Sequence, residues 1–86
     1  MVRDRNWGEI LMQIGENLEW AQEVLEHALE NQDELNDFEE GFVVSYLGKL
    51  MDYGEECFIS EGQLEVINRL AKYFGFFSKD WEEFYD

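Results

Sequence analysis

Proline is absent from this 86-residue chain, and cysteine and histidine each occur once. Because Cys57 has no second cysteine to pair with, no disulfide can form within the chain, which fits a reducing cytoplasm. No apolar run approaches the roughly 18 residues of a membrane span, so we expect a soluble, cytoplasmic protein without a membrane partner. The absence of repeats and linkers predicts a single acidic helical domain over residues 1–86.

The side chains that most enzymes use for catalysis are scarce. His27, the single histidine, lies on the polar side of the first expected helix, among glutamates and without a neighbouring nucleophile. Cys57 lies in an apolar stretch with no cationic neighbour to activate it, so we expect a buried structural thiol. A general base without a nucleophile gives little support for catalysis, and we predict no catalytic residue and no enzymatic activity.

Residues 52–63 have the length of a calcium-binding loop but not its pattern. Gly54, Cys57 and Gln63 occupy the third, sixth and twelfth positions, where that loop needs an oxygen ligand, a turn glycine and a glutamate. Cysteine and histidine do not cluster as they do in zinc sites, and the seven glycines are scattered instead of forming a phosphate-binding loop. We therefore expect no metal ion and no cofactor.

Apolar residues spaced three and four apart predict a long first helix from Trp7 to about Glu30, with Asn6 as its N-cap. A second helix is predicted over about 38–53, capped by Asn36 or Asp37. The run Phe42-Val43-Val44 has β-branched character, so a strand is the competing interpretation there, but the longer helical spacing favours a helix.

Residues 55–59 should connect to a third helix, with Phe58 and Ile59 turned inward. Ser60 and Gln63 form a capping box at the start of that helix, and Gly75 follows its last apolar residue, Phe74, where a terminating glycine belongs. A short last helix is expected from Ser78, with Trp81, Phe84 and Tyr85 on its apolar side. The predicted fold class is all-α, a compact three-helix bundle with a short fourth C-terminal helix.

The charge balance is the outlying property of the sequence. Aspartate and glutamate number 21 against six lysines and arginines, which gives a net charge of −15. From Asn6 to Gly48 there are eleven acids and no lysine or arginine. Such a field repels nucleic acid, so we expect no direct nucleic-acid binding, and it favours a basic partner. A DNA-binding helix-turn-helix using Arg69 and Lys72 is an improbable alternative for the same reason.

The acids of the first helix recur every three or four residues and therefore share one face: Glu16, Glu19, Glu23, Glu26 and Glu30. Like charges at this spacing cost about 0.2–0.5 kcal/mol per pair, and helices that need only solubility usually mix the two signs. The row is either solvated surface or a binding face that imitates a nucleic-acid backbone. Both interpretations stay open.

Trp20 projects beside this row of acids. Packing within the helix does not explain a large aromatic ring at that position. An exposed tryptophan in a charged rim is a common binding hot spot. The alternative is that the aromatic C-terminal region covers Trp20, because six rings lie between Phe74 and Tyr85. Those rings must pack on the first helix or on a second subunit, so a homodimer stays open as well.

In charge and size the chain resembles small acidic phage proteins that block restriction, repair or CRISPR nucleases, although no motif matches a particular family. The predicted function is therefore a nucleic-acid (DNA) mimic that inhibits a basic nucleic-acid-binding protein or nuclease complex, as anti-CRISPR or anti-restriction inhibitors do. The alternative is a small regulatory or inhibitory subunit that binds a host transcription or replication protein through its aromatic surface. The predicted partner-binding residues are Glu16, Glu19, Trp20, Glu23, Glu26, Glu30, Asp33 and Glu34.

Overall fold

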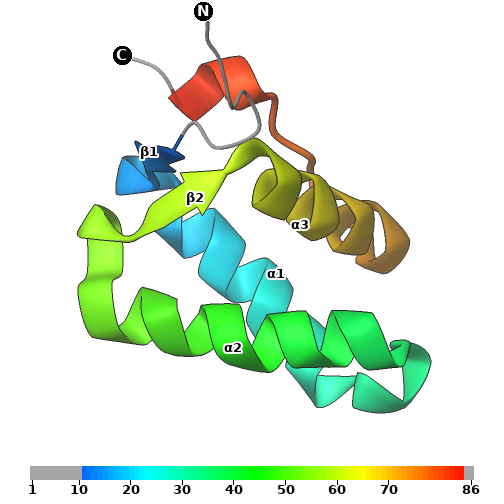
Figure 1. Ribbon diagram of the computed structural model, residues 1–86. Coiled ribbons are helices and arrows are strands. Elements are labelled where there is room, and N and C mark those ends of the chain that lie inside the picture. The colour runs from blue at the N-terminus through cyan, green and yellow to red at the C-terminus, as the bar shows by residue number, and fades with distance from the viewer. Residues whose placement is uncertain (1–10, 85–86) are drawn as a thin grey trace, which may run out of the picture.

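The computed structural model describes residues 11–84, and the side chains of residues 11–82. Over these residues the chain is mostly helical, with α1 (Leu18–Glu30), α2 (Asp37–Tyr53) and α3 (Glu61–Phe74) as its α-helices (Figure 1). Two short strands, β1 (Leu11–Gln13) and β2 (Phe58–Ser60), pair antiparallel with Met12 opposite Ile59. Three 3-10 turns connect these elements, η2 (Gly15–Asn17), η3 (Gln32–Glu34) and η4 (Gly54–Glu56), and a fourth, η5 (Trp81–Phe84), follows α3.

α1 is the central helix of the fold, because it packs against both α2 and α3. Its buried face meets the apolar faces of the other two helices, and Ile14 and Ile59 close the core at the end where the strands lie. Burial of this kind stabilises a small domain by roughly 1.5–3 kcal/mol per large side chain. The largest fully buried side chains are those of Ile14, Val24, Leu25, Val43, Leu50, Ile59, Ile67 and Leu70.

The predicted ends of α2 and α3 are confirmed. The Asn36 side chain accepts the Glu39 amide at 2.7 Å while the Glu39 carboxylate accepts the Asn36 amide at 3.1 Å. Ser60 and Gln63 form the same reciprocal pair at the start of α3. α3 ends at Gly75, whose φ of +87° is a left-handed conformation that favours glycine. The strand considered for residues 42–44 does not form, since they lie within α2.

The predicted start of the first helix is wrong. α1 begins at Leu18, and the residues before it form β1 and η2; Asn6 and Trp7, where the start was expected, lie outside the described residues. Gly15 has a φ of +55°, which interrupts any continuous helix at that point. The Ile14 amide instead donates to the carbonyl oxygen of Cys57, the residue before β2, at 2.8 Å, so the chain after β1 bonds to a distant segment and not to a preceding helical turn. The fold is therefore not purely α-helical.

Two expectations for the later part of the chain also change. Ile59 is buried as predicted, but Phe58 is 54% exposed, because successive side chains of a strand point to opposite faces. The fourth helix is not confirmed: Trp81–Phe84 form one 3-10 turn, and Tyr85 lies outside the described residues. None of the helices found between residues 11 and 84 is long and apolar enough to span a membrane.

Candidate acidic interaction face

Five exposed acids lie in a row along one side of η2 and α1, which we call the acidic row: Glu16 in η2, and Glu19, Glu23, Glu26 and Glu30 in α1. A helix turns about 100° per residue, so the row occupies a narrow sector of the surface. The opposite side of α1 is fully buried through Ala21, Val24, Leu25 and Ala28. The hydrophobic core therefore fixes which way the carboxylates face.

The acidic row has a regular axial spacing. With a rise of about 1.5 Å per residue, steps of three and four residues place successive carboxylates about 4.5–6 Å apart along the helix. The phosphates of one DNA strand advance about 3.4 Å per nucleotide, so the repeat is similar but not equal. α1 itself contains no lysine or arginine, and no base occurs in the connection to α2.

Asp33 and Glu34 continue the negative surface beyond the end of α1, in the exposed turn η3. The Glu34 carboxylate accepts a hydrogen bond from the Tyr73 hydroxyl at 2.9 Å, which ties η3 to α3. This contact raises the pKa of Tyr73, because the neutral phenol donates to the carboxylate and the phenolate would be repelled by it. Glu34 thus lies beside the predicted row but is also engaged in holding the fold together.

Trp20 is covered by the C-terminal region, the second of the two arrangements considered above. Its indole Nε1–H donates to the Phe77 carbonyl oxygen at 2.8 Å, and its ring packs against the core. The Lys79 ammonium lies 5.8 Å from the centre of the ring, a cation–π contact. Trp20 therefore has a structural role, and its place among the partner-binding residues stays a prediction.

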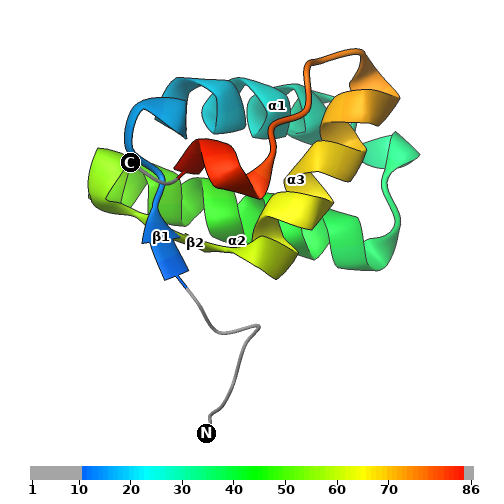
Figure 2. The ribbon, with the colours of Figure 1, turned by 90° about the horizontal axis from the view of Figure 1, so that it is seen from above.

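The segment after α3, residues 75–80, runs back beside α1 and leads into η5 (Figure 2). The Asn68 side chain holds this segment in both directions: its Nδ2 donates to the Lys79 carbonyl oxygen at 2.7 Å, and its Oδ1 accepts the Lys79 amide at 2.9 Å. His27, exposed as predicted, contacts Phe74 and Phe76 edge-on with ring centroids 4.9 Å and 5.5 Å apart. α1 thus supplies the acids on one side and receives this segment on its flank.

A hollow of about 620 Å³ opens between the acidic row and the 75–80 segment. The residues that line it are Glu16, Glu19, Trp20 and Glu23 from the helical side and Gly75, Phe76, Phe77 and Lys79 from the 75–80 segment. The side chain of Phe77 is 87% exposed, the largest exposure of any large apolar side chain in the described residues. Sequence reasoning missed Phe77; the signal was the pair Phe76-Phe77 directly after a helix-ending glycine, where only one ring packs inward.

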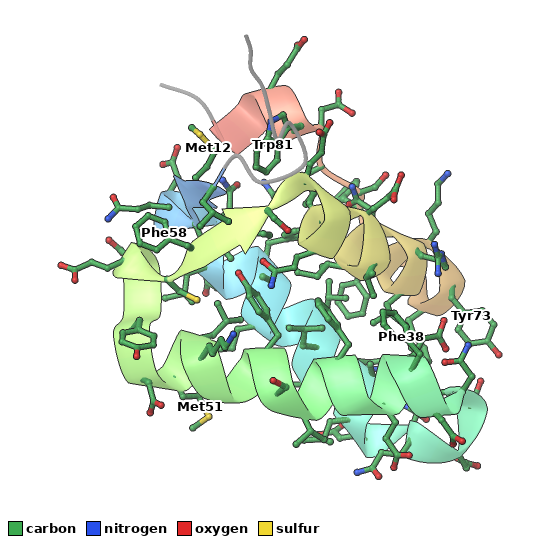
Figure 3. The ribbon with its side chains drawn as sticks, viewed as in Figure 1. Met12, Phe38, Met51, Phe58, Tyr73 and Trp81 are labelled. Atoms are coloured by element: carbon green, nitrogen blue, oxygen red, sulfur yellow. The ribbon has the colours of Figure 1, made fainter. Side chains whose placement is uncertain are left out.

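A second hollow, of about 570 Å³, lies at the sheet end of α2. Leu11, Tyr53 and Phe58 line it and are each more than half exposed, whereas Cys57 is buried as expected. Tyr46 donates its hydroxyl to the Phe58 carbonyl oxygen at 2.7 Å, and burial raises its pKa above the ordinary value. Figure 3 shows Phe58 pointing away from the helices at this end, so the hollow is an exposed apolar surface.

Within the described residues, no group of three or more histidine, cysteine, aspartate or glutamate side chains is arranged to hold a metal ion. The bases of this part of the chain are Lys49, Arg69, Lys72 and Lys79, of which Arg69 and Lys72 are exposed on α3. Comparison with protein-family models, with curated proteins and with solved structures finds no match to this chain. The functional argument therefore depends on the geometry of these surfaces.

Proposed function

We propose that this protein acts in the cytoplasm as a nucleic-acid mimic, which occupies the basic groove of a nucleic-acid-binding protein or nuclease complex and so inhibits it. The observation that supports this most directly is the acidic row, a set of exposed carboxylates at regular spacing on a helix without lysine or arginine. Phage-encoded anti-CRISPR and anti-restriction inhibitors are the class of protein that such a surface fits. The contact residues we propose are the eight predicted from the sequence.

The mechanism would be competition. A groove that binds nucleic acid carries lysine and arginine side chains placed to neutralise phosphates, and its affinity depends on the release of condensed counterions. A rigid row of carboxylates offers the same sign of charge on a protein scaffold and approaches rapidly, because opposite charges steer the encounter. The chain would then occupy the groove without being a substrate for the chemistry performed there.

The cost of the acidic row argues against mere solubility. Each neighbouring pair of carboxylates destabilises the helix by about 0.2–0.5 kcal/mol, so the three pairs of the row that lie within α1 together cost about 0.6–1.5 kcal/mol. A mixture of glutamate and lysine would be equally soluble and would stabilise α1 instead. A local arrangement that reduces stability without a structural benefit is typical of a functional surface.

The experiment is a pull-down at low salt with the immobilised protein against a panel of purified basic proteins: a CRISPR nuclease, a restriction endonuclease and a nucleic-acid-binding repressor. We expect capture of at least one, loss of capture as salt rises, and competition by duplex DNA. A triple variant with Glu19, Glu23 and Glu26 changed to lysine should lose capture. The matched control changes Asp52, Glu55 and Glu65, which are equally exposed, to lysine and so produces the same net charge.

If the first variant still binds and is still competed by DNA, the acidic row is not the interface and the proposal fails. If both variants lose capture equally, net charge alone is responsible, which also contradicts a specific mimic.

The second candidate is a small regulatory or inhibitory subunit that binds a host transcription or replication protein through apolar surface. The observation that favours it is the hollow of about 570 Å³ edged by Leu11, Tyr53 and Phe58. Changing Phe58 to glutamate would abolish this interaction, and nucleic acid would not compete. Binding that withstands salt but is lost in that variant would select this function over nucleic-acid mimicry.

A further inference from the structure

The exposed ring of Phe77 is the feature of the acidic face that folding alone does not explain. Its side chain is 87% exposed, whereas its neighbour Phe76 packs against the core. The backbone of Phe77 is fixed, since its carbonyl oxygen accepts the Trp20 indole. Two residues later, the Asn68 side chain holds Lys79 on both of its backbone groups. The backbone that carries the ring therefore has a defined position although the ring itself is exposed.

The hollow in front of Phe77 combines aromatic side chains with an excess of negative charge. Glu16, Glu19 and Glu23 line it against the single cation of Lys79, so its lining carries a net charge of −2. Carboxylates next to an aromatic face attract a cation in two ways, by direct charge and through the electron-rich face of the ring. Neutral or negative ligands gain neither interaction.

The chain already places a cation in this hollow. The Lys79 ammonium lies 5.8 Å from the centroid of the Trp20 ring. This contact is an observation independent of the acidic row, and it shows a positive group beside one aromatic ring of the lining. Phe77 provides a second ring in the lining of the same hollow, and this ring is more exposed to solvent than that of Trp20.

We propose that this hollow is an arginine-binding site, in which a guanidinium of the basic partner stacks on Phe77 and forms hydrogen bonds with the carboxylates of Glu16, Glu19 and Glu23. The planar guanidinium stacks on aromatic rings and forms paired hydrogen bonds with carboxylates, whereas an ammonium is a strongly hydrated point charge. Arginine is therefore the occupant, in preference to lysine. This inference rests on the proposed function and names the group by which the partner would be recognised.

The test uses two capped tripeptides as probes, one of three arginines and one of three lysines, titrated into the isotope-labelled protein and followed by NMR. We expect the arginine peptide to bind about five-fold more tightly than the lysine peptide. The Trp20 indole N–H signal, assigned with the Trp20→Phe variant, should shift more than that of Trp81. The Phe77→Ala variant should weaken arginine-peptide binding about five-fold and leave lysine-peptide binding nearly unchanged.

The matched control is Phe58→Ala, which removes an exposed ring from the other hollow, where Lys49 is one of the lining residues. It should bind both peptides as the unmodified chain does. Because the Phe77 side chain is exposed, its removal should leave the thermal melting curve unchanged, which circular dichroism checks.

Equal affinity for the two peptides, or an unchanged affinity of Phe77→Ala for the arginine peptide, would overturn the arginine site. In that event the charge-reversal experiment on Glu19, Glu23 and Glu26 still decides the proposed function by itself. Conversely, the arginine peptide could bind as expected while the charge-reversal variant still captures the partner. That result would support the arginine site and contradict nucleic-acid mimicry.

Discussion

The Trp20 indole N–H donates to the carbonyl oxygen of Phe77 at 2.8 Å, across 57 positions of sequence. Through this bond the most exposed ring of the described residues is attached to the helix that carries the acidic row. Trp20, which the sequence indicated as a binding hot spot, thus positions the backbone of Phe77. The relationship divides the aromatic residues near α1 into a structural member, Trp20, and a surface member, Phe77.

Replacing Trp20 with phenylalanine tests that division. The variant keeps an aromatic ring against the core but removes the N–H donor, so the free energy of unfolding should fall by about 1 kcal/mol. The loss should be concentrated in residues 75–80, whose amides should exchange faster with solvent. Urea denaturation and hydrogen exchange measure the two effects. The control is Met51→Ala, which removes a side chain that is 71% exposed on α2 and should change stability by less than about 0.5 kcal/mol (Figure 3).

Asn68 should hold the 75–80 segment from the other side. Asn68→Ala removes both hydrogen bonds to the Lys79 backbone and should destabilise the chain by about 1–3 kcal/mol. Trypsin should then cleave after Lys79 faster than in the unmodified chain, because the segment opens more often. Asn68→Asp retains the acceptor for the Lys79 amide but loses the donor to its carbonyl, so its cleavage rate should fall between the two. Identical rates for all three chains would show that other contacts hold the segment.

The helix ends of α2 and α3 were predictable because their signals are local. In the two capping boxes, Asn36 with Glu39 and Ser60 with Gln63, the partners are three residues apart, and both hydrogen bonds form in each. Gly75 likewise needs only its own backbone conformation to end α3. Such features depend on a few adjacent residues, so sequence alone carries them.

The prediction for the N-terminal part of the chain was wrong because the structure there depends on contacts that are distant in sequence. β1 forms because its backbone pairs with β2, with Leu11 opposite Ser60. The residues next to Leu11 in the sequence give no signal for so distant a partner. The three-and-four spacing continued through Ile14 and Leu18 because both contribute to the core, Ile14 from outside the helix. The same holds for the candidate site. The helical period predicted the exposure of the acids, but the exposure of Phe77 depends on how the 75–80 segment lies against α1, which neighbouring residues do not determine.

Tyr46 should make stability depend on alkaline pH. Burial, followed by the neighbouring Cys57, raises the pKa of Tyr46 above 10.0. The folded chain therefore retains this proton where the unfolded chain loses it, so the stabilisation is complete below pH about 10 and is lost as the pH rises further. Tyr46→Phe has no proton to lose there, and its free energy of unfolding should fall less steeply between pH 9 and 11.

The same variant also removes the donor to the Phe58 carbonyl oxygen, which should cost about 1 kcal/mol at neutral pH. A control for that general loss is Val66→Ala, which shortens a half-buried side chain on α3 but keeps the tyrosine. It should be destabilised at neutral pH and retain the original pH slope. Equal slopes for Tyr46→Phe and the unmodified chain in urea titrations would contradict the assignment to Tyr46.

Glu23 lies at the centre of the acidic row, four residues after Glu19 and three before Glu26, and it offers a test in which stability and binding move in opposite directions. Glu23→Lys replaces two repulsive pairs with two attractive ones, so the free protein should become more stable by about 0.5–2 kcal/mol at low salt. The gain should shrink at 1 M salt, where charges are screened beyond about 3 Å. Partner capture should weaken in the same variant.

The matched control is Glu65→Lys on α3, which makes the same change of charge at another exposed helix position. There the substitution turns the repulsive spacing to Glu61, four residues earlier, into an attractive one and the attractive spacing to Arg69, four residues later, into a repulsive one, so stability should change little while partner capture is retained. Urea unfolding at both salt concentrations gives the stabilities, and the pull-down gives the binding. If Glu23→Lys destabilises the free chain, the acidic row contributes to folding. The argument that the row lowers stability and is therefore kept for function would then be wrong.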